Sequence, residues 1–208
     1  MESTPNSRAP EFWDTRIRAG RMPWDKGGVP ADLSHYLAGV HSSGGCVLIP
    51  GCGTAYEVRA FRDAGYEVIG IDFCEAAVEM GRRALGPVSQ AIVLGDFFTY
   101  DFKGQRFDLI YERAFVCSMS PALWPLYAQR IKDLLLTGGL LLGSFYYGPK
   151  DDDGPPFGLE PDEMGSLLGD AFTCLEDREV QDSMSLYAGG ERWQVWRCTG
   201  TMEVVGRP

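Results

Sequence analysis

The chain lacks the residue pattern of a metal centre. Its 208 residues include only two histidines, and no two of its six cysteines form a C-x-x-C pair. A zinc site needs such closely spaced ligands, so we expect no metal. Widely spaced cysteines without a secretory leader are typical of free thiols in a reducing cytoplasm. The cysteines are Cys46, Cys52, Cys74, Cys117, Cys174 and Cys198.

Positive charge is also scarce. The chain carries 19 Lys and Arg against 29 Asp and Glu, which gives a net charge of −10 at pH 7. Nucleic-acid binding depends on Lys and Arg that neutralise phosphates, and the same holds for an anionic membrane surface. No apolar run approaches the roughly 20 residues of a membrane span. The sequence therefore favours a monomeric cytoplasmic protein whose partner is a small molecule.

What is present is an alternation of apolar strands and amphipathic helices. The alternation fills residues 46–147 and is typical of a parallel sheet covered by helices on both faces. We expect one domain over residues 11–208, with a helical cap over 11–45 and a flexible arm over 1–10. The predicted strands are 46–49, 66–71, 91–94, 107–111 and 140–146, and helices are predicted to end at 64, to span 75–85 and to run from 121 to 136.

The C-terminal part follows a different pattern. A short helix is predicted over 161–168, followed by strands over 172–180 and 192–198. Because no long helix separates these two strands, they should form an antiparallel hairpin at the edge of the sheet.

Four predicted strands end on residues suited to ligand binding. They are followed by Gly51-Cys52-Gly53, Asp72, Gly95-Asp96 and Glu112. In open α/β sheets, ligands bind at the carboxyl ends of the strands, so these residues should share one site.

The glycine pair and Asp72 fit a nucleoside without pyrophosphate. Tyr56 occupies the third position of a would-be G-x-G-x-x-G, where a dinucleotide motif needs a small residue. S-adenosylmethionine lacks a pyrophosphate and is not obstructed there. Asp72 follows Gly51 by 21 residues, the spacing of a carboxylate that accepts from ribose hydroxyls. A plain structural turn for the glycines and a helix cap for Asp72 remain as alternatives.

Asp96 is followed by Phe97 and Phe98. A carboxylate accepts hydrogen bonds from an adenine amino group, and a neighbouring aromatic ring stacks on the base. The alternative is a loop carboxylate beside core aromatics.

These residues, with two tryptophan motifs near the N-terminus, resemble the thiopurine S-methyltransferase superfamily, which includes thiol and halide methyltransferases. The resemblance covers nearly the whole chain. It is carried by Phe12-Trp13-Asp14-x-Arg16, Pro23-Trp24-Asp25, Pro50-Gly51-Cys52-Gly53, Asp72, Gly95-Asp96-Phe97-Phe98 and Phe107-Asp108-x-Ile110-Tyr111-Glu112-Arg113. It implies a Rossmann-like class I methyltransferase fold, the cofactor S-adenosylmethionine and the product S-adenosylhomocysteine.

The resemblance also implies roles for individual residues. Trp24, Gly51 and Gly53 would line the methionine portion of the cofactor, Asp72 would hold the ribose, and Glu112 would lie at the same site. Phe73, Asp96 and Phe97 would surround the adenine. The acceptor would meet Phe12, Trp13, Arg113 and Phe115, and Arg113 is the candidate for steering an anionic acceptor. Independently of the resemblance, the composition of residues 148–158 predicts a loop that flanks the acceptor opening. Phe115 and Cys117 are more similar to the thiol and halide members.

For three of these residues a purely structural role is the alternative. Trp13 and Trp24 would otherwise be packing aromatics, and Arg113 would otherwise pair with Asp108 or Glu112 at the surface.

The expected reaction is displacement at an activated methyl group by a small soft nucleophile, with sulfur favoured. A thiol has a pKa of about 8.5, so no strong general base is required and no catalytic residue is assigned. Halide, selenium or tellurium species, and O or N of a heteroaromatic ring, remain as acceptors. A dinucleotide oxidoreductase and a non-catalytic cofactor-binding module are the competing functions.

Overall fold

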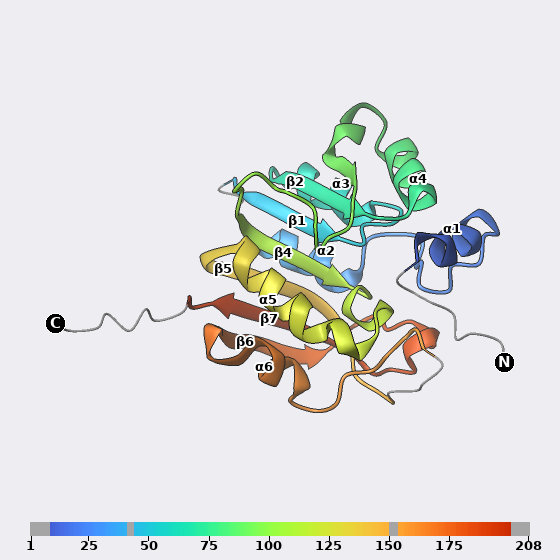
Figure 1. Ribbon diagram of the computed structural model, residues 1–208. Coiled ribbons are helices and arrows are strands. Elements are labelled where there is room, and N and C mark those ends of the chain that lie inside the picture. Colours follow the sequence, from blue (N-terminus) through green and yellow to red (C-terminus); the bar gives the residue numbers. More distant parts are fainter. Residues whose placement is uncertain (1–8, 41–43, 150–153, 201–208) are drawn as a thin grey trace.

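The computed structural model describes residues 9–40, 44–149 and 154–200. Over these residues the chain builds one seven-stranded sheet in the order β3-β2-β1-β4-β5-β7-β6 (Figure 1). Strand β7 runs antiparallel to both β5 and β6, and the other paired strands are parallel. The strands are β1 (Cys46–Pro50), β2 (Glu67–Asp72), β3 (Ile92–Leu94), β4 (Phe107–Arg113), β5 (Leu135–Tyr146), β6 (Phe172–Glu179) and β7 (Glu191–Cys198). The predicted α/β fold with its C-terminal hairpin is confirmed.

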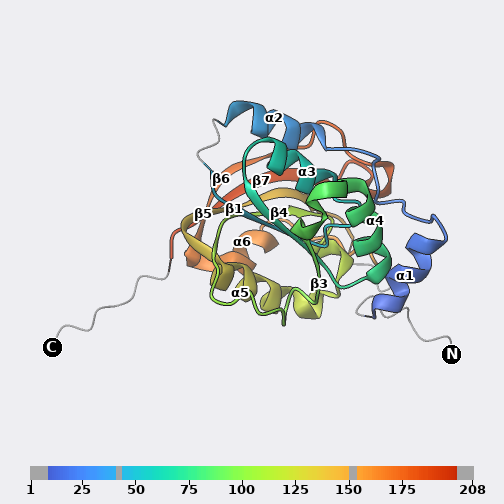
Figure 2. The ribbon, with the colours of Figure 1, turned by 90° about the horizontal axis from the view of Figure 1, so that it is seen from above.

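Helices cover both faces of the sheet (Figure 2). Helices α2 (Ala31–Gly39) and α3 (Tyr56–Asp63) lie on one face, and α5 (Trp124–Leu134) and α6 (Glu163–Leu168) lie on the other. Side chains of β1 alternate between the two cores: Val47 and Ile49 pack toward α3, and Leu48 packs toward α5. A strand buried on both faces reads as an unbroken apolar run, which is why this segment was recognisable in the sequence.

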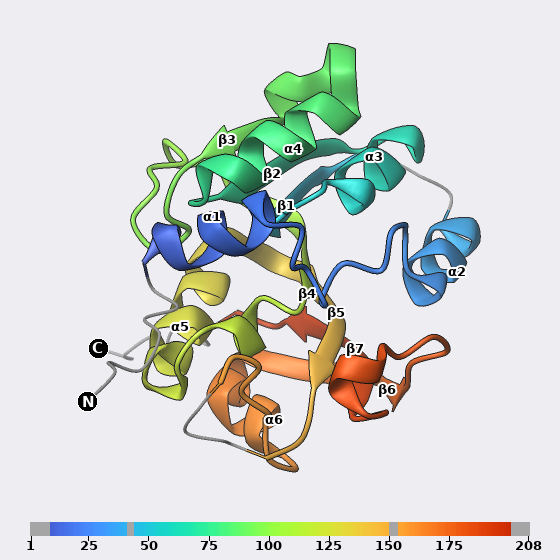
Figure 3. The same ribbon diagram turned by 90° about the vertical axis from the view of Figure 1, so that its right-hand side faces the viewer.

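Helix α1 (Pro10–Arg18) lies beyond the carboxyl ends of β1 and β4 and packs against α4 (Glu75–Leu85) (Figures 1 and 3). Asp14 fixes this contact, because its Oδ1 accepts from the backbone N–H of Ala76 at 2.7 Å and from the thiol of Cys74 at 3.2 Å. A carboxylate at this position caps the N-terminus of α4 from a different element. The sheet and the cap helix therefore meet at the strand ends.

The predicted helix over 121–136 is shorter in the structure. Residues Pro121–Leu123 form a single 3-10 turn, α5 ends at Leu134, and β5 begins at Leu135. Ser120 makes no side-chain cap hydrogen bond. Leu135 is fully buried and pairs with Phe107 across a register shift. Its burial in the sheet outweighs the helix propensity of a leucine run. The glycines predicted to stop the helix, Gly138 and Gly139, lie inside β5 instead.

The predicted arm over residues 1–10 lies almost wholly outside the described residues, and α1 already begins at Pro10. The predicted cap region over 11–45 contains α1 and α2, apart from residues 41–43, which the structure does not describe.

Candidate active site

A cavity of about 510 Å³ opens at the carboxyl ends of the parallel strands. The strand order reverses between β1 and β4, and the crevice at such a switch point is where open α/β sheets bind ligands. All the predicted site residues except Glu112 line this cavity: Phe12, Trp13, Trp24, Gly51, Gly53, Asp72, Phe73, Asp96, Phe97, Arg113 and Phe115.

The glycine loop after β1 leaves the floor of the cavity bare. Gly51 and Gly53 have φ of +61° and +48°, a left-handed conformation that favours glycine. A Cβ on Gly51 would come within 2.6 Å of the Phe115 ring. From the other side, a Cβ on Gly81 of α4 would come within 2.7 Å of the Gly53 carbonyl oxygen. The loop is thus packed between a helix and an aromatic ring, and it lines the cavity with backbone atoms at both glycines.

Asp72 ends β2 with its carboxylate held by two backbone groups. Oδ2 accepts from the N–H of Gly53 at 3.1 Å and Oδ1 accepts from the N–H of Cys74 at 3.0 Å. Burial raises its pKa to about 6, although these hydrogen bonds favour the ionised form. Asp72 fills only part of its alternative role as a cap for α4. Asp72 bonds Cys74, which precedes the helix, and Asp14 takes the N–H of Ala76.

Two aromatic groups wall the cavity. Trp13 contacts Trp24 edge-on, with ring centroids 5.2 Å apart, and Phe12 contacts Trp13 at 5.0 Å. On the other side Phe97 contacts Phe115 at 5.3 Å. The two tryptophans pack on each other and also line the cavity, so their packing role is confirmed and their binding role stays a prediction.

Asp96 is exposed at the rim and organises its own turn. Its Oδ1 accepts from the N–H of Phe98 at 2.8 Å. Phe97, beside it, is buried and joins the core that includes Tyr127. Both the ligand and the loop interpretation of Asp96 are compatible with this geometry.

Glu112 does not reach the cavity. Its side chain is completely buried, and its Oε1 accepts from the N–H groups of Phe115 at 2.8 Å and Val116 at 2.7 Å. Its Oε2 has no hydrogen-bond partner among the described residues, and burial raises the pKa of the carboxyl to about 7. The geometry makes Glu112 a positioning residue, which fixes the turn that carries the Phe115 ring.

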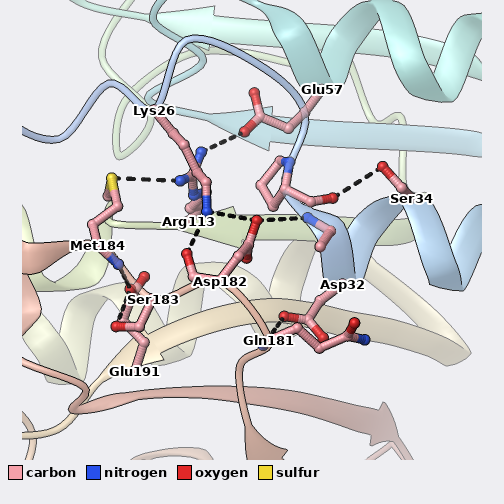
Figure 4. A network of polar contacts seen from close by, with 12 residues as sticks. Lys26, Asp32, Ser34, Glu57, Arg113, Gln181, Asp182, Ser183, Met184 and Glu191 are labelled. Atoms are coloured by element: carbon pink, nitrogen blue, oxygen red, sulfur yellow. Dashed lines mark hydrogen bonds and ion pairs between the residues drawn. The ribbon is translucent and has the colours of Figure 1, made fainter.

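Arg113 pairs with Glu57 rather than with either of the partners considered from sequence. Its Nη1 lies 3.4 Å from Oε1 of Glu57, and its Nη2 lies 3.6 Å from Sδ of Met184 (Figure 4). The alternative of a surface pair with Asp108 or Glu112 is wrong, because Asp108 accepts from the N–H of Cys46 at 2.8 Å and Glu112 accepts from the N–H groups of the 115–116 turn. Sequence analysis missed Glu57, whose signal was an acidic residue on the buried face of α3.

The half of the cavity over β4, called the acceptor half below, is lined by apolar and weakly polar groups apart from the Arg113–Glu57 ion pair. Cys117 is buried, and burial raises the pKa of its thiol far from neutrality, so it is no ready nucleophile. Its Sγ lies 4.0 Å from the hydroxyl oxygen of Tyr187. Gly154–Pro156 also line this half, in line with the predicted loop over 148–158, of which residues 150–153 lie outside the described part.

Two kinds of feature are absent from the described residues. These residues include no group of three or more His, Cys, Asp or Glu side chains placed to hold a metal ion. They also include no helix long and apolar enough to cross a membrane.

Comparison with known proteins decides the family. The family model for thiopurine S-methyltransferase matches residues 8–205. The chain belongs to the thiopurine S-methyltransferase family. It is 32% identical over 196 residues to a probable thiol methyltransferase 2 of Arabidopsis thaliana, covering 91% of this chain and 85% of that one. It is 29% identical over 204 residues to a thiopurine S-methyltransferase of Pseudomonas fluorescens SBW25, covering 89% and 90%.

A solved structure shows the same fold. The 1,6-didemethyltoxoflavin-N1-methyltransferase of Burkholderia thailandensis, with bound S-adenosylhomocysteine, superposes with a TM-score of 0.71. It is 18% identical and covers 91% of this chain and 87% of its own. The chain of the thiopurine S-methyltransferase family described here is thus an S-adenosylmethionine-dependent methyltransferase with a class I Rossmann-like fold.

Proposed function

We propose that the enzyme transfers the methyl group of S-adenosylmethionine to the sulfur atom of a small thiol. The main support for sulfur as the acceptor atom is the set of side chains that line the acceptor half of the cavity. Among the described residues that line the cavity there is no histidine or lysine to act as a general base, and of its carboxylates Glu57 is paired with Arg113 and Asp72 accepts from two backbone N–H groups. The other side chains of the acceptor half are aromatic, apolar or weakly polar. Oxygen and nitrogen acceptors need help to lose a proton, whereas a thiol with a pKa of about 8.5 does not.

The cofactor would occupy the half of the cavity over β1, β2 and β3. Its methionine portion would lie along the backbone of the glycine loop, where Gly51 and Gly53 place no side chain in the cavity, and Trp24 would pack against it. Asp72 would accept from the ribose hydroxyls, since each carboxylate oxygen keeps acceptor capacity beyond its one backbone bond. Phe73, Asp96 and Phe97 would surround the adenine at the ends of β2 and β3.

The chain contributes orientation and exclusion of water. The bound cofactor supplies an already activated methyl group, so the protein's task is to align the acceptor with it. Alignment of two reactants contributes up to about 7–11 kcal/mol in well-oriented systems. Phe12, Trp13 and Phe115 would hold the acceptor and exclude water from the site. A thiolate that meets a sulfonium loses charge, and an apolar site favours that change.

The names of the relatives are consistent with this proposal, since one is called a thiol methyltransferase and another a thiopurine S-methyltransferase. The test is methyl transfer from deuterium-labelled S-adenosylmethionine to a mixture of aliphatic thiols, aromatic thiols, thiopurines, sulfide and iodide, read by mass spectrometry. We expect labelled thioethers. Labelled methyl iodide alone, or no product from a protein that still binds the cofactor, would sink the proposal.

We further propose that the enzyme works as a cytoplasmic monomer on a small molecule and binds no nucleic acid. Support comes from the net charge of −10 and from six cysteines that are all unpaired in the structure. Sedimentation at micromolar concentration should give the mass of one chain, 22.9 kDa.

A further inference from the structure

The charge of Arg113 is balanced within the acceptor half of the cavity. Its guanidinium faces the Glu57 carboxylate at 3.4 Å, and both side chains are nearly buried, with 12% and 11% of their surface exposed. Its Nη2 also contacts the uncharged sulfur of Met184 at 3.6 Å. Glu191 and Asp182 also lie within electrostatic range of Arg113. Figure 4 shows these side chains around the arginine.

Lys26, a second cation in this region, adds no unpaired charge. Lys26 forms an ion pair with Asp182 at 2.6 Å, and the same carboxylate accepts from the N–H of Ala31 at 3.0 Å. Although burial opposes ionisation, the hydrogen bonds from Lys26 and Ala31 hold the pKa of Asp182 below its usual value. The two opposite charges of this pair therefore offset each other.

The cavity as a whole has a small excess of negative charge. Among the described residues its lining holds four carboxylates and three guanidiniums, from Asp25, Glu57, Asp72, Asp96, Arg16, Arg21 and Arg113. The cofactor carries a sulfonium, an ammonium and a carboxylate, which sum to a single positive charge. With the cofactor bound, the site is close to neutral. A second negative charge on the acceptor, away from its sulfur, would find the two described cations of this region, Arg113 and Lys26, already paired with carboxylates.

We propose that Glu57 sets the charge preference of the acceptor site: by pairing with Arg113 it selects thiols whose remainder is uncharged and disfavours thiols that carry a carboxylate. This rests on the proposed function. An unpaired Arg113 would attract anionic acceptors, which is the role expected for it from sequence alone. Glu57 reverses that expectation, because a nearly buried ion pair presents little net charge to a ligand.

The test compares 3-mercaptopropanamide with 3-mercaptopropionate, which have nearly the same shape and differ by one charge. Their dissociation constants are measured by tryptophan fluorescence on the complex with S-adenosylhomocysteine, which cannot react. Trp13 and Trp24 line the cavity and serve as probes. Turnover with S-adenosylmethionine is measured separately, so a failure of sulfur methylation is seen independently of the binding preference.

We expect the wild-type complex to bind the amide about tenfold more tightly than the carboxylate, a modest electrostatic effect. Glu57→Gln, which keeps the shape of the side chain, should remove or reverse that ratio. Glu57→Gln combined with Arg113→Gln should bring the ratio near one. Equal binding of both thiols by wild type, or an unchanged ratio in Glu57→Gln, would overturn the proposal. The wild-type ratio alone tests it if Glu57→Gln does not fold.

Discussion

At the scale of a single residue, the buried carboxylate of Asp72 makes cofactor affinity depend on pH. Its pKa is about 6 in the folded chain and near 3.9 unfolded, so the folded state binds the proton more tightly. The contribution of Asp72 to stability is therefore full below about pH 4 and is lost as pH rises through 6. Binding of ribose hydroxyls needs the ionised form, so cofactor affinity should rise over the same range.

Calorimetric titration with S-adenosylhomocysteine at pH 5, 6 and 7 checks this. Asp72→Asn should weaken binding roughly 10–100-fold, the worth of hydrogen bonds to a charged group, and should flatten the pH dependence. Asp101→Asn is the matched control, because Asp101 also accepts from a backbone N–H but does not line the cavity. If the two variants bind alike, Asp72 is not a cofactor ligand.

Gly51 provides a second residue-scale prediction. Gly51→Ala introduces a Cβ 2.6 Å from the Phe115 ring at a φ of +61°. Gly104→Ala has a similar backbone conformation, with a φ of +78°, and nothing within 4 Å. Both variants should lose about 1–2 kcal/mol for the left-handed backbone. Gly51→Ala should lose a further 1–3 kcal/mol or so from overpacking, read from urea unfolding, and equal losses would contradict the packing described.

At the scale of elements, helix α1 is held over the cavity by Asp14. The residue joins the first helix to the N-terminus of α4, and Trp13 beside it faces the cavity. Asp14→Ala removes a cap worth about 1 kcal/mol and loosens α1. We expect weaker binding of S-adenosylhomocysteine, by roughly fivefold for that loss of free energy. The control is Thr15→Ala, an exposed neighbour whose hydroxyl bonds only within α1, which should bind like wild type.

A feature could be predicted from the sequence where neighbouring residues carry its signal. The run Cys46–Ile49 and the residues at the strand ends are local features, and they located the cavity. The pairing of Arg113 with Glu57 joins residues 56 positions apart, and Asp14 caps a helix 62 positions away. No local pattern encodes such contacts. Glu112 was misplaced for a different reason: its position at a strand end was right, but the direction of its side chain is set by the 115–116 turn, whose two N–H groups it accepts from.

At the scale of the whole molecule, cofactor binding should stabilise the fold. A ligand at 100 times its dissociation constant adds about 2.7 kcal/mol. For a chain of this size each kcal/mol raises Tm by about 2–4 °C, so calorimetry should show a rise of roughly 5–10 °C with S-adenosylhomocysteine. Asp72→Asn at the same ligand concentration should show a much smaller rise. An unchanged Tm for wild type would mean that the folded chain does not bind S-adenosylhomocysteine at this concentration, and would contradict the assignment of the cavity.

The central claim is that sulfur is the acceptor atom, and it is tested most directly with three acceptors that share one ring. Thiophenol, phenol and aniline differ only in the reacting atom, and each is offered with deuterium-labelled S-adenosylmethionine in molar excess. The cavity lacks a histidine or lysine base among the described residues, so we predict labelled methyl phenyl sulfide formed in step with S-adenosylhomocysteine, and negligible anisole or N-methylaniline. Anisole or N-methylaniline formed as fast as the sulfide would contradict the account.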